Sequence, residues 1–186
     1  MTVITPEEYL ERERAAEFKS EYHCGRIYAM AGTSYRHWVI LGNIIRELGQ
    51  AIRETPCTVG PSDLRVRISE DHYVYPDTVV VCEDAKFADD QKDTLLNPRL
   101  IIEVLSHTTE AYDRGYKAIQ YRKLESLKEY VFVSQTEPHV EIFRLGTEGW
   151  ILTEKEGLDG VCHLESVGCD LRLADIFEKV SFDLRP

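Results

Sequence analysis

The sequence predicts an α/β domain of the α+β type, in which helices flank a mixed central β-sheet. Two segments, 73–82 and 99–105, are nearly continuous apolar runs, as is typical of central strands covered on both faces. Helical patterns stand before, between and after the strand segments, which indicates layers of helix packed on sheet. The length of 186 residues suits one domain with a full hydrophobic core, and we expect residues 1–186 to form it.

The first helix is predicted from Thr5 to about Lys19. Thr5 is a suitable N-cap, because Pro6 takes the first helical position and Glu8 follows the cap by three residues, as in a capping box. A glycine at position 25 then allows a turn into a short strand at 26–31.

The other elements follow from periodicity and turn residues. Helices are predicted at 37–53, 111–124 and 173–180, and strands at 64–68, 129–134, 139–144 and 150–154, with a polar loop at 83–97. Segment 64–68 alternates apolar and basic residues, which predicts a half-exposed strand. In helix 111–124, we interpret the spacing of Tyr112, Tyr116 and Ile119 as a packing stripe rather than as a base-stacking platform, the alternative interpretation of the same spacing.

Composition and charge indicate an ordinary globular protein of the cytoplasm. Hydrophobic residues make up 43% of the chain and charged residues 30%, and no apolar run approaches the ~20 residues that span a bilayer. The N-terminus lacks the pattern of a signal peptide. The five cysteines are odd in number and none forms a C-x-x-C pair, so we expect reduced thiols. The formal net charge of −11 disfavours tight, nonspecific DNA binding but does not exclude a local basic patch.

Two acids interrupt the apolar runs. Asp77 lies within 73–82 and Glu103 within 99–105. Unpaired buried carboxylates are very unfavourable, and two on neighbouring strands also repel each other. Mg²⁺ commonly binds one or two carboxylates together with waters and substrate phosphates, so it removes both problems. The alternative is that each acid pairs with a separate Arg or Lys or lies at an exposed strand end, and the pattern leaves both open.

Two further charged residues allow two interpretations each. Lys117 lies four residues after Asp113, so the two can form a helical ion pair; near a metal-bound water, the same lysine can position that water, help deprotonate it or stabilise phosphoryl charge. Glu21, just beyond the first helix, is either a solvated charge or a third acid of the site.

A larger set of residues resembles the Uma-type family of restriction endonucleases. The resemblance runs from about Thr5 to Trp150. It rests on Glu21, Gly25, Met30 and His37, on Tyr75-Pro76-Asp77, on Asn97-Pro98 with Ile102-Glu103-Val104-Leu105-Ser106, and on Thr109, Asp113-Arg114-Gly115, Lys117 and Tyr121. Each short motif alone is weak, but the combination is specific.

The resemblance implies the PD-(D/E)XK nuclease superfamily and a restriction-endonuclease-like core. It implies that Asp77 and Glu103 bind Mg²⁺, for which Mn²⁺ can substitute, together with the backbone carbonyl of Val104. The usual lysine position, two residues after the acid, is Leu105 here, and Lys117 on the following helix matches the family's replacement lysine. Glu21 matches an N-terminal glutamate that completes such sites, so the expected catalytic set is Asp77, Glu103, Lys117 and Glu21.

The implied reaction is hydrolysis of DNA phosphodiester bonds that leaves a 5′-phosphate. Lys117 would orient or activate the attacking water, and Glu21 would assist a second metal or orient a ligand. We expect DNA contacts from His37, Arg65, Arg67 and Arg114, and DNA as a partner rather than RNA or a membrane. A homodimer is also expected, with segment 129–144 offering an exposed strand edge.

A second function is compatible with the same residues. The acidic net charge and the displaced lysine would also suit a non-catalytic DNA- or protein-binding module that retains the nuclease fold. Cleavage with many turnovers excludes the module, whereas binding that is indifferent to Asp77 and Glu103 favours it.

Overall fold

Helices and strands have the following bounds in the computed structural model, which describes residues 3–30, 32–107 and 110–182. The helical segments are α1 (Pro6–Ala15), α2 (Tyr35–Ala51), α3 (Glu110–Tyr112), the π-helical turn η1 (Asp113–Lys117), α4 (Ala118–Tyr121) and α5 (Leu173–Ile176). The strands are β1 (Ser20–His23), β2 (Arg26–Ala29), β3 (Cys57–Pro61), β4 (Arg65–Ser69), β5 (His72–Val74), β6 (Thr78–Cys82), β7 (Thr94–Leu95), β8 (Leu100–Leu105), β9 (Glu129–Ser134), β10 (His139–Gly146), β11 (Gly149–Glu156), β12 (Val161–Leu164) and β13 (Cys169–Arg172).

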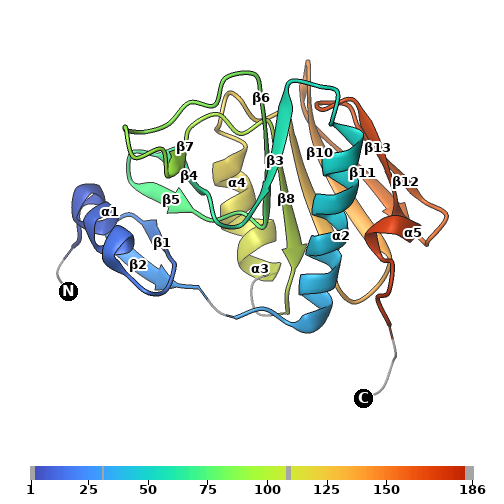
Figure 1. Ribbon diagram of the computed structural model, residues 1–186, viewed down its shortest axis with the longest axis horizontal. Coiled ribbons are helices and arrows are strands. Elements are labelled where there is room, and N and C mark those ends of the chain that lie inside the picture. The colour runs from blue at the N-terminus through green and yellow to red at the C-terminus, as the bar shows by residue number, and fades with distance from the viewer. Residues whose placement is uncertain (1–2, 31, 108–109, 183–186) are drawn as a thin grey trace.

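Two β-sheets and a small hairpin organise these strands (Figure 1). The larger sheet has the order β11-β10-β9-β8-β6-β3, and the smaller has the order β2-β1-β5-β4-β7. Strand β8 is parallel to β9 and antiparallel to β6, so the larger sheet is mixed. The predicted α+β class with a mixed sheet flanked by helices is therefore confirmed.

The N-terminal helix begins as predicted and ends early. The Thr5 hydroxyl accepts a hydrogen bond from the Glu8 backbone N–H, and the Thr5 N–H donates to the Glu8 carboxylate, which completes the capping box. The helix ends at Ala15 rather than near Lys19, because the chain must turn to enter β1.

The apolar run 73–82 is not one strand but two, in different sheets. Strand β5 belongs to the smaller sheet and β6 to the larger, and residues 75–77 carry the chain across. Pro76 has no N–H to give to a β-ladder, which is consistent with a break at this point. Asp77 therefore lies where the two sheets meet.

Alternation along β8 divides the core. Leu100, Ile102 and Val104 pack with α2 in one cluster, whereas Ile101 and Leu105 pack in a second cluster that includes α4. Because side chains alternate between the faces of a strand, the intervening Glu103 points toward the second cluster and its helix. The sheet thus directs one carboxylate into a largely apolar layer.

The helix predicted over 111–124 is present, but its faces are the reverse of the prediction. Tyr112, Tyr116 and Ile119 are 37%, 36% and 51% exposed, so the proposed packing stripe faces solvent. Asp113 and Lys117 are instead buried, at 5% exposure each. The prediction was wrong because it assumed that the aromatic face is the buried one, whereas the charged face meets the acid of β8.

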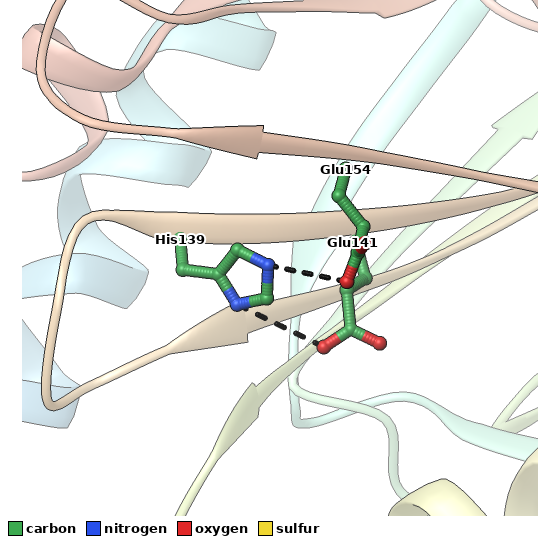
Figure 2. A group of neighbouring side chains, drawn as sticks. All are labelled: His139, Glu141 and Glu154. Carbon is green, nitrogen blue, oxygen red and sulfur yellow. Dashed lines mark ion pairs between the residues drawn. The ribbon is translucent and has the colours of Figure 1, made fainter.

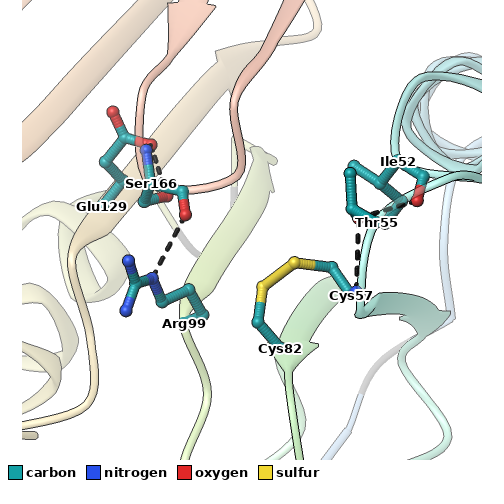
Figure 3. Close-up of a disulfide and its surroundings, with 7 residues drawn as sticks. All are labelled: Ile52, Thr55, Cys57, Cys82, Arg99, Glu129 and Ser166. Atoms are coloured by element: carbon teal, nitrogen blue, oxygen red, sulfur yellow. Dashed lines mark hydrogen bonds between the residues drawn. A yellow bond between two sulfur atoms is a disulfide. The ribbon is translucent and has the colours of Figure 1, made fainter.

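Two of the five cysteines form a disulfide. Cys57 and Cys82 lie directly opposite each other on β3 and β6, and their sulfur atoms are bonded (Figure 3). The prediction of reduced thiols is therefore wrong for this pair. The sequence patterns predict no strand at 57–61, so they do not place the two cysteines side by side.

The segment expected to offer an exposed strand edge lies inside the larger sheet. Strand β9 has β8 and β10 as neighbours, and β10 has β9 and β11. The expectation that 129–144 presents the edge is therefore wrong, because β11 covers it and is itself the edge strand. In the described part of the chain, no helix is both long and apolar enough to span a membrane.

Candidate functional site

Asp77 and Glu103 lie next to each other on neighbouring strands of the larger sheet. Thr78 of β6 is paired with Ile102 of β8 in an antiparallel ladder. Asp77, which precedes Thr78, and Glu103, which follows Ile102, therefore lie at the same end of this strand pair. The Asp77 backbone N–H donates to Glu103 Oε2 over 3.1 Å, and the Val104 backbone N–H donates to Asp77 Oδ2 over 2.8 Å. Each carboxylate is therefore oriented by the backbone of the other strand.

Lys117 joins this pair from the helix that covers it. Its Nζ lies 2.8 Å from Glu103 Oε1 and 3.2 Å from Glu21 Oε1, but 3.7 Å from Asp113 Oδ1. The local helical ion pair with Asp113 is thus the longest of its three contacts. The π-helical turn η1 ends at this lysine, and such turns frequently occur at functional sites.

Glu21 reaches the same place from the smaller sheet. It stands on β1, and its Oε1 accepts a hydrogen bond of 3.1 Å from the backbone N–H of Tyr75 in addition to the Lys117 contact. Its side chain is 12% exposed, so it is not a freely solvated charge. Strands from both sheets and one helix therefore converge on Lys117.

His37 approaches Asp77 from α2. Its Nε2 lies 3.0 Å from Asp77 Oδ2, and the residue is 8% exposed. Its other ring nitrogen, Nδ1, is buried and lacks a hydrogen-bond partner among the described residues. His37 therefore orients the Asp77 carboxylate, and its expected contact with DNA stays a prediction.

Burial dominates the electrostatics of the cluster. Desolvation, together with the Asp77 and Asp113 carboxylates, raises the pKa of Glu103 to about 8 against the opposing effect of the Lys117 ammonium. Desolvation lowers the pKa of Lys117, but the carboxylates of Glu103 and Glu21 outweigh it and raise that pKa well above its usual value. The neighbouring carboxylates therefore favour the protonated form of Lys117, and burial favours the neutral form of Glu103.

Tyr121 is a member of the site to which sequence reasoning gave no role. Its hydroxyl donates to Glu103 Oε1 over 3.2 Å, and it is fully buried. It stands four residues after Lys117, one turn along the same helix. Residues four apart share one face of a helix, so this spacing could have placed Tyr121 beside the candidate catalytic lysine from the sequence alone.

The three arginines expected to face DNA differ in their surroundings. Arg65 is 2% exposed and pairs with Asp93 at 3.0 Å, so it has no exposed guanidinium to offer a phosphate. The prediction that segment 64–68 is half exposed is wrong at Arg65, because the smaller sheet buries that end of β4. Arg114 is partly exposed but forms ion pairs of 2.7 Å with Glu110 and 2.6 Å with Glu141. Arg67 is partly exposed on β4.

A second cluster has the composition of a metal site. Among residues 3–30, 32–107 and 110–182, His139, Glu141 and Glu154 are the one group of three whose candidate ligand atoms all lie within 4.8 Å (Figure 2). Both oxygens of Glu141 are engaged by Arg114, at 2.6 Å each, so this carboxylate already has its cation. Glu141 therefore needs no ion, although His139 Nε2 is buried and has no hydrogen-bond partner among the described residues.

The donor atoms of Asp77 and Glu103 suit a hard divalent cation. Both supply carboxylate oxygens, which Mg²⁺ prefers. Asp77 Oδ2 accepts the hydrogen bond from the Val104 N–H and lies 3.0 Å from His37 Nε2. Glu21 does not close a compact group of three with them, and Lys117 lies between it and Glu103. The geometry therefore favours a pair of carboxylate ligands, with Glu21 assigned to the lysine.

Comparison with known proteins places this arrangement in a family. The family model Uma2, described as "Putative restriction endonuclease", matches residues 6–174. The chain belongs to the Uma2 family. Two proteins of Synechocystis sp. are similar to it: "Uncharacterized protein sll1609" is 37% identical over 83% of this chain and 89% of that protein, and "Uncharacterized protein slr1290" is 33% identical over 96% and 94%.

A solved structure shares the fold of this Uma2 chain. It is described as a putative nuclease belonging to DUF820 from Anabaena variabilis. Its TM-score is 0.77 at 19% sequence identity, and the match covers 94% of this chain and 97% of that one. The expected membership of the Uma-type family is confirmed, and the fold is shared with this solved structure.

Proposed function

We propose that the chain is a metal-dependent endonuclease that hydrolyses phosphodiester bonds of DNA. The observation that carries the proposal is the convergence of Asp77, Glu103 and Lys117, from two strands and a helix, within direct hydrogen-bonding or ion-pair contact. The description of the Uma2 family as restriction endonucleases supports it, as does the nuclease description of the structural neighbour.

In this proposal, Asp77 and Glu103 hold Mg²⁺, with Mn²⁺ as a substitute, and the backbone carbonyl of Val104 is a further candidate ligand. When bound, the ion would lower the pKa of a coordinated water and neutralise charge on the scissile phosphate. His37 and the Val104 N–H hold the Asp77 carboxylate in one orientation, and Tyr121 holds Glu103. The products would carry a 5′-phosphate.

Lys117 supplies positive charge and hydrogen bonds beside the proposed metal site. The carboxylates of Glu103 and Glu21 favour its protonated form and raise its pKa. In this form it donates hydrogen bonds that orient the attacking water or stabilise phosphoryl oxygens. Glu21 keeps the ammonium group in place, and its expected role as a further metal ligand remains a prediction.

Cleavage of plasmid and oligonucleotide DNA with Mg²⁺ or Mn²⁺ tests the proposal. We expect Asp77→Asn and Lys117→Met each to lower the rate by roughly 100-fold or more. Glu148→Gln, in the exposed turn between β10 and β11, is the matched control and should cleave like the native chain. Activity that survives Asp77→Asn would contradict the proposed site.

The non-catalytic module makes a different set of predictions. It requires stoichiometric DNA or protein binding, no cleavage of any substrate, and indifference to the Asp77→Asn and Glu103→Gln substitutions. The acidic net charge of −11 is the observation in its favour.

Location and assembly belong to the same proposal. The proposed location is the cytoplasm, where disulfides such as Cys57–Cys82 are rare. A homodimer built by strand addition would use β11, where Ile151 and Leu152 are 58% and 45% exposed. Sedimentation as a monomer at micromolar concentration would exclude such a dimer.

A further inference from the structure

Exposed aromatic side chains surround the candidate catalytic lysine. Tyr112 and Tyr116 lie on the helical segment that carries Lys117, and their rings are stacked, with centroids 6.2 Å apart and planes inclined by 19°. Both are more than one-third exposed. A helix that buries Asp113 and Lys117 while presenting two tyrosines to solvent is arranged opposite to an ordinary surface helix.

The β1–β2 hairpin brings a third tyrosine to the same surface. Tyr28 of β2 is the cross-strand partner of Glu21, so the two side chains share one face of the hairpin. That face meets the helix, since Glu21 contacts Lys117 and the His23 ring lies 4.6 Å from that of Tyr116. Tyr28 is 48% exposed. We call Tyr28, Tyr112 and Tyr116 the aromatic rim.

A further pair of exposed rings stands beside the other acid. Tyr35 and Trp38 are 78% and 62% exposed in the first turn of α2, with ring centroids 6.0 Å apart. They flank His37, which contacts Asp77. Exposed aromatic groups are therefore found on both helices that supply side chains to the acid cluster.

The net charge of the chain and the pairing of its arginines disfavour binding of a DNA duplex through its phosphates. The net charge of the chain is −11, and two of the three arginines expected to contact DNA are already paired with carboxylates. Affinity for double-stranded DNA comes mainly from Lys and Arg at phosphates. Ring faces, by contrast, stack on bases irrespective of sequence, but only where those bases are unpaired or exposed.

We propose that the aromatic rim binds unpaired bases of DNA, so that the preferred substrate is single-stranded DNA or an unpaired segment rather than intact duplex. The inference rests on the proposed nuclease function and specifies the substrate class of that same site. Stacking on the rim would place the adjoining phosphate at Asp77, Glu103 and Lys117. Stacking contributes about 5- to 150-fold in affinity for each base, enough to compensate for few phosphate contacts.

The test measures DNA binding without cleavage. An Asp77→Asn chain is titrated, by fluorescence anisotropy, into a labelled single strand of about 20 nucleotides, its duplex, and the duplex with a central unpaired loop. We expect the single strand and the loop to bind at least about 10-fold more tightly than the duplex. In the same background, Tyr112→Ala with Tyr116→Ala should remove about 10-fold or more of the single-strand affinity and leave duplex binding unchanged.

Matched variants separate stacking from folding. Tyr112→Phe with Tyr116→Phe keeps the rings and should keep the affinity, and Tyr28→Ala removes a ring from a different element and should weaken it. Phe18→Ala removes an 82% exposed ring outside the rim and should have no effect. Equal or tighter duplex binding, single-strand binding that survives loss of the rim, or no binding to any of the three DNAs would each overturn the inference.

Cleavage of the same three DNAs by the native chain with Mg²⁺ or Mn²⁺ keeps the two proposals distinct. Cleavage of duplex without preference would overturn the single-strand inference and leave the nuclease intact. Strand-selective, rim-dependent binding without cleavage would overturn the nuclease and leave the rim as a binding surface for unpaired bases.

Discussion

Replacement of Lys117 by methionine removes a buried ammonium group and leaves its carboxylate partners in place. Lys117 is 5% exposed, and Glu103, 2.8 Å away, is 3% exposed. Loss of one partner of a buried ion pair typically costs about 3–5 kcal/mol, because the remaining charge is left without compensation. The cost here belongs at the lower end of that range, because burial already raises the pKa of Glu103 and this carboxyl group can take up a proton once the lysine is gone.

Urea unfolding followed by circular dichroism, with EDTA present, measures this cost. A domain is typically stable by about 5–15 kcal/mol, so a loss of about 3 kcal/mol in Lys117→Met should remove about a fifth or more of the free energy of unfolding. The urea midpoint should fall by about 1–1.5 M at a slope of about 2–3 kcal/mol per M. Lys117→Arg, which keeps the charge, is the conservative control and should lose less.

The double variant Lys117→Met, Glu103→Gln distinguishes a paired charge from general packing. If the two groups compensate each other, the double variant should lose at least about 1 kcal/mol less than the sum of the single losses. A loss below about 1 kcal/mol for Lys117→Met, or strict additivity in the double variant, would refute the argument that this lysine neutralises the acid cluster.

Three further outcomes are expected. Burial lowers the pKa of His72 from 6.5 to about 4, so between these pH values only the unfolded chain takes up a proton at this residue. The free energy of unfolding should therefore fall by about 3 kcal/mol as the pH drops to 4, and the urea midpoints of His72→Leu should lack this dependence. Cys57 and Cys82 lie 25 residues apart, so their bond should contribute about 3 kcal/mol; reductant should lower the urea midpoint of the native chain but not of the Cys57→Ser, Cys82→Ser variant. Leu105→Lys should restore part of the cleavage lost in Lys117→Met, measured on plasmid DNA, whereas Leu105→Gln should not.

Sequence reasoning succeeded where a local rule and the tertiary structure agree. The capping residues of the first helix act within one turn, so Thr5 and Glu8 predict it without knowledge of the rest of the fold. Asp77 and Glu103 stand out in the sequence as candidate site residues because an acid inside an apolar run conflicts with burial, and this conflict can be recognised without a structure. Their adjacency required the register of β6 and β8, which the sequence suggests only through the family resemblance.

Failures occurred where a contact joins distant segments. Strand β3 has no strong alternation, so its pairing with β6 and the disulfide it carries were missed. Arg65 looked half-exposed because alternation describes one strand, whereas its burial comes from Tyr9, Tyr75 and Asp93 on other elements. Helix 111–124 was assigned the wrong face because aromatic rings are more often buried than lysine.

The buried charged face of helix 111–124 explains how Lys117 reaches Glu103 from outside β8. Leu105 and Glu103 share one face of β8, because residues two apart point the same way, so a lysine at 105 would lie beside the acid. That position is instead 4% exposed and packed in the apolar cluster with α4. The ammonium group reaches Glu103 from η1, above the same face, and this requires the helix to bury its charged side. The aromatic side is thereby turned to solvent next to the site. The burial of Lys117 and the exposure of the aromatic rim are two consequences of one helix orientation.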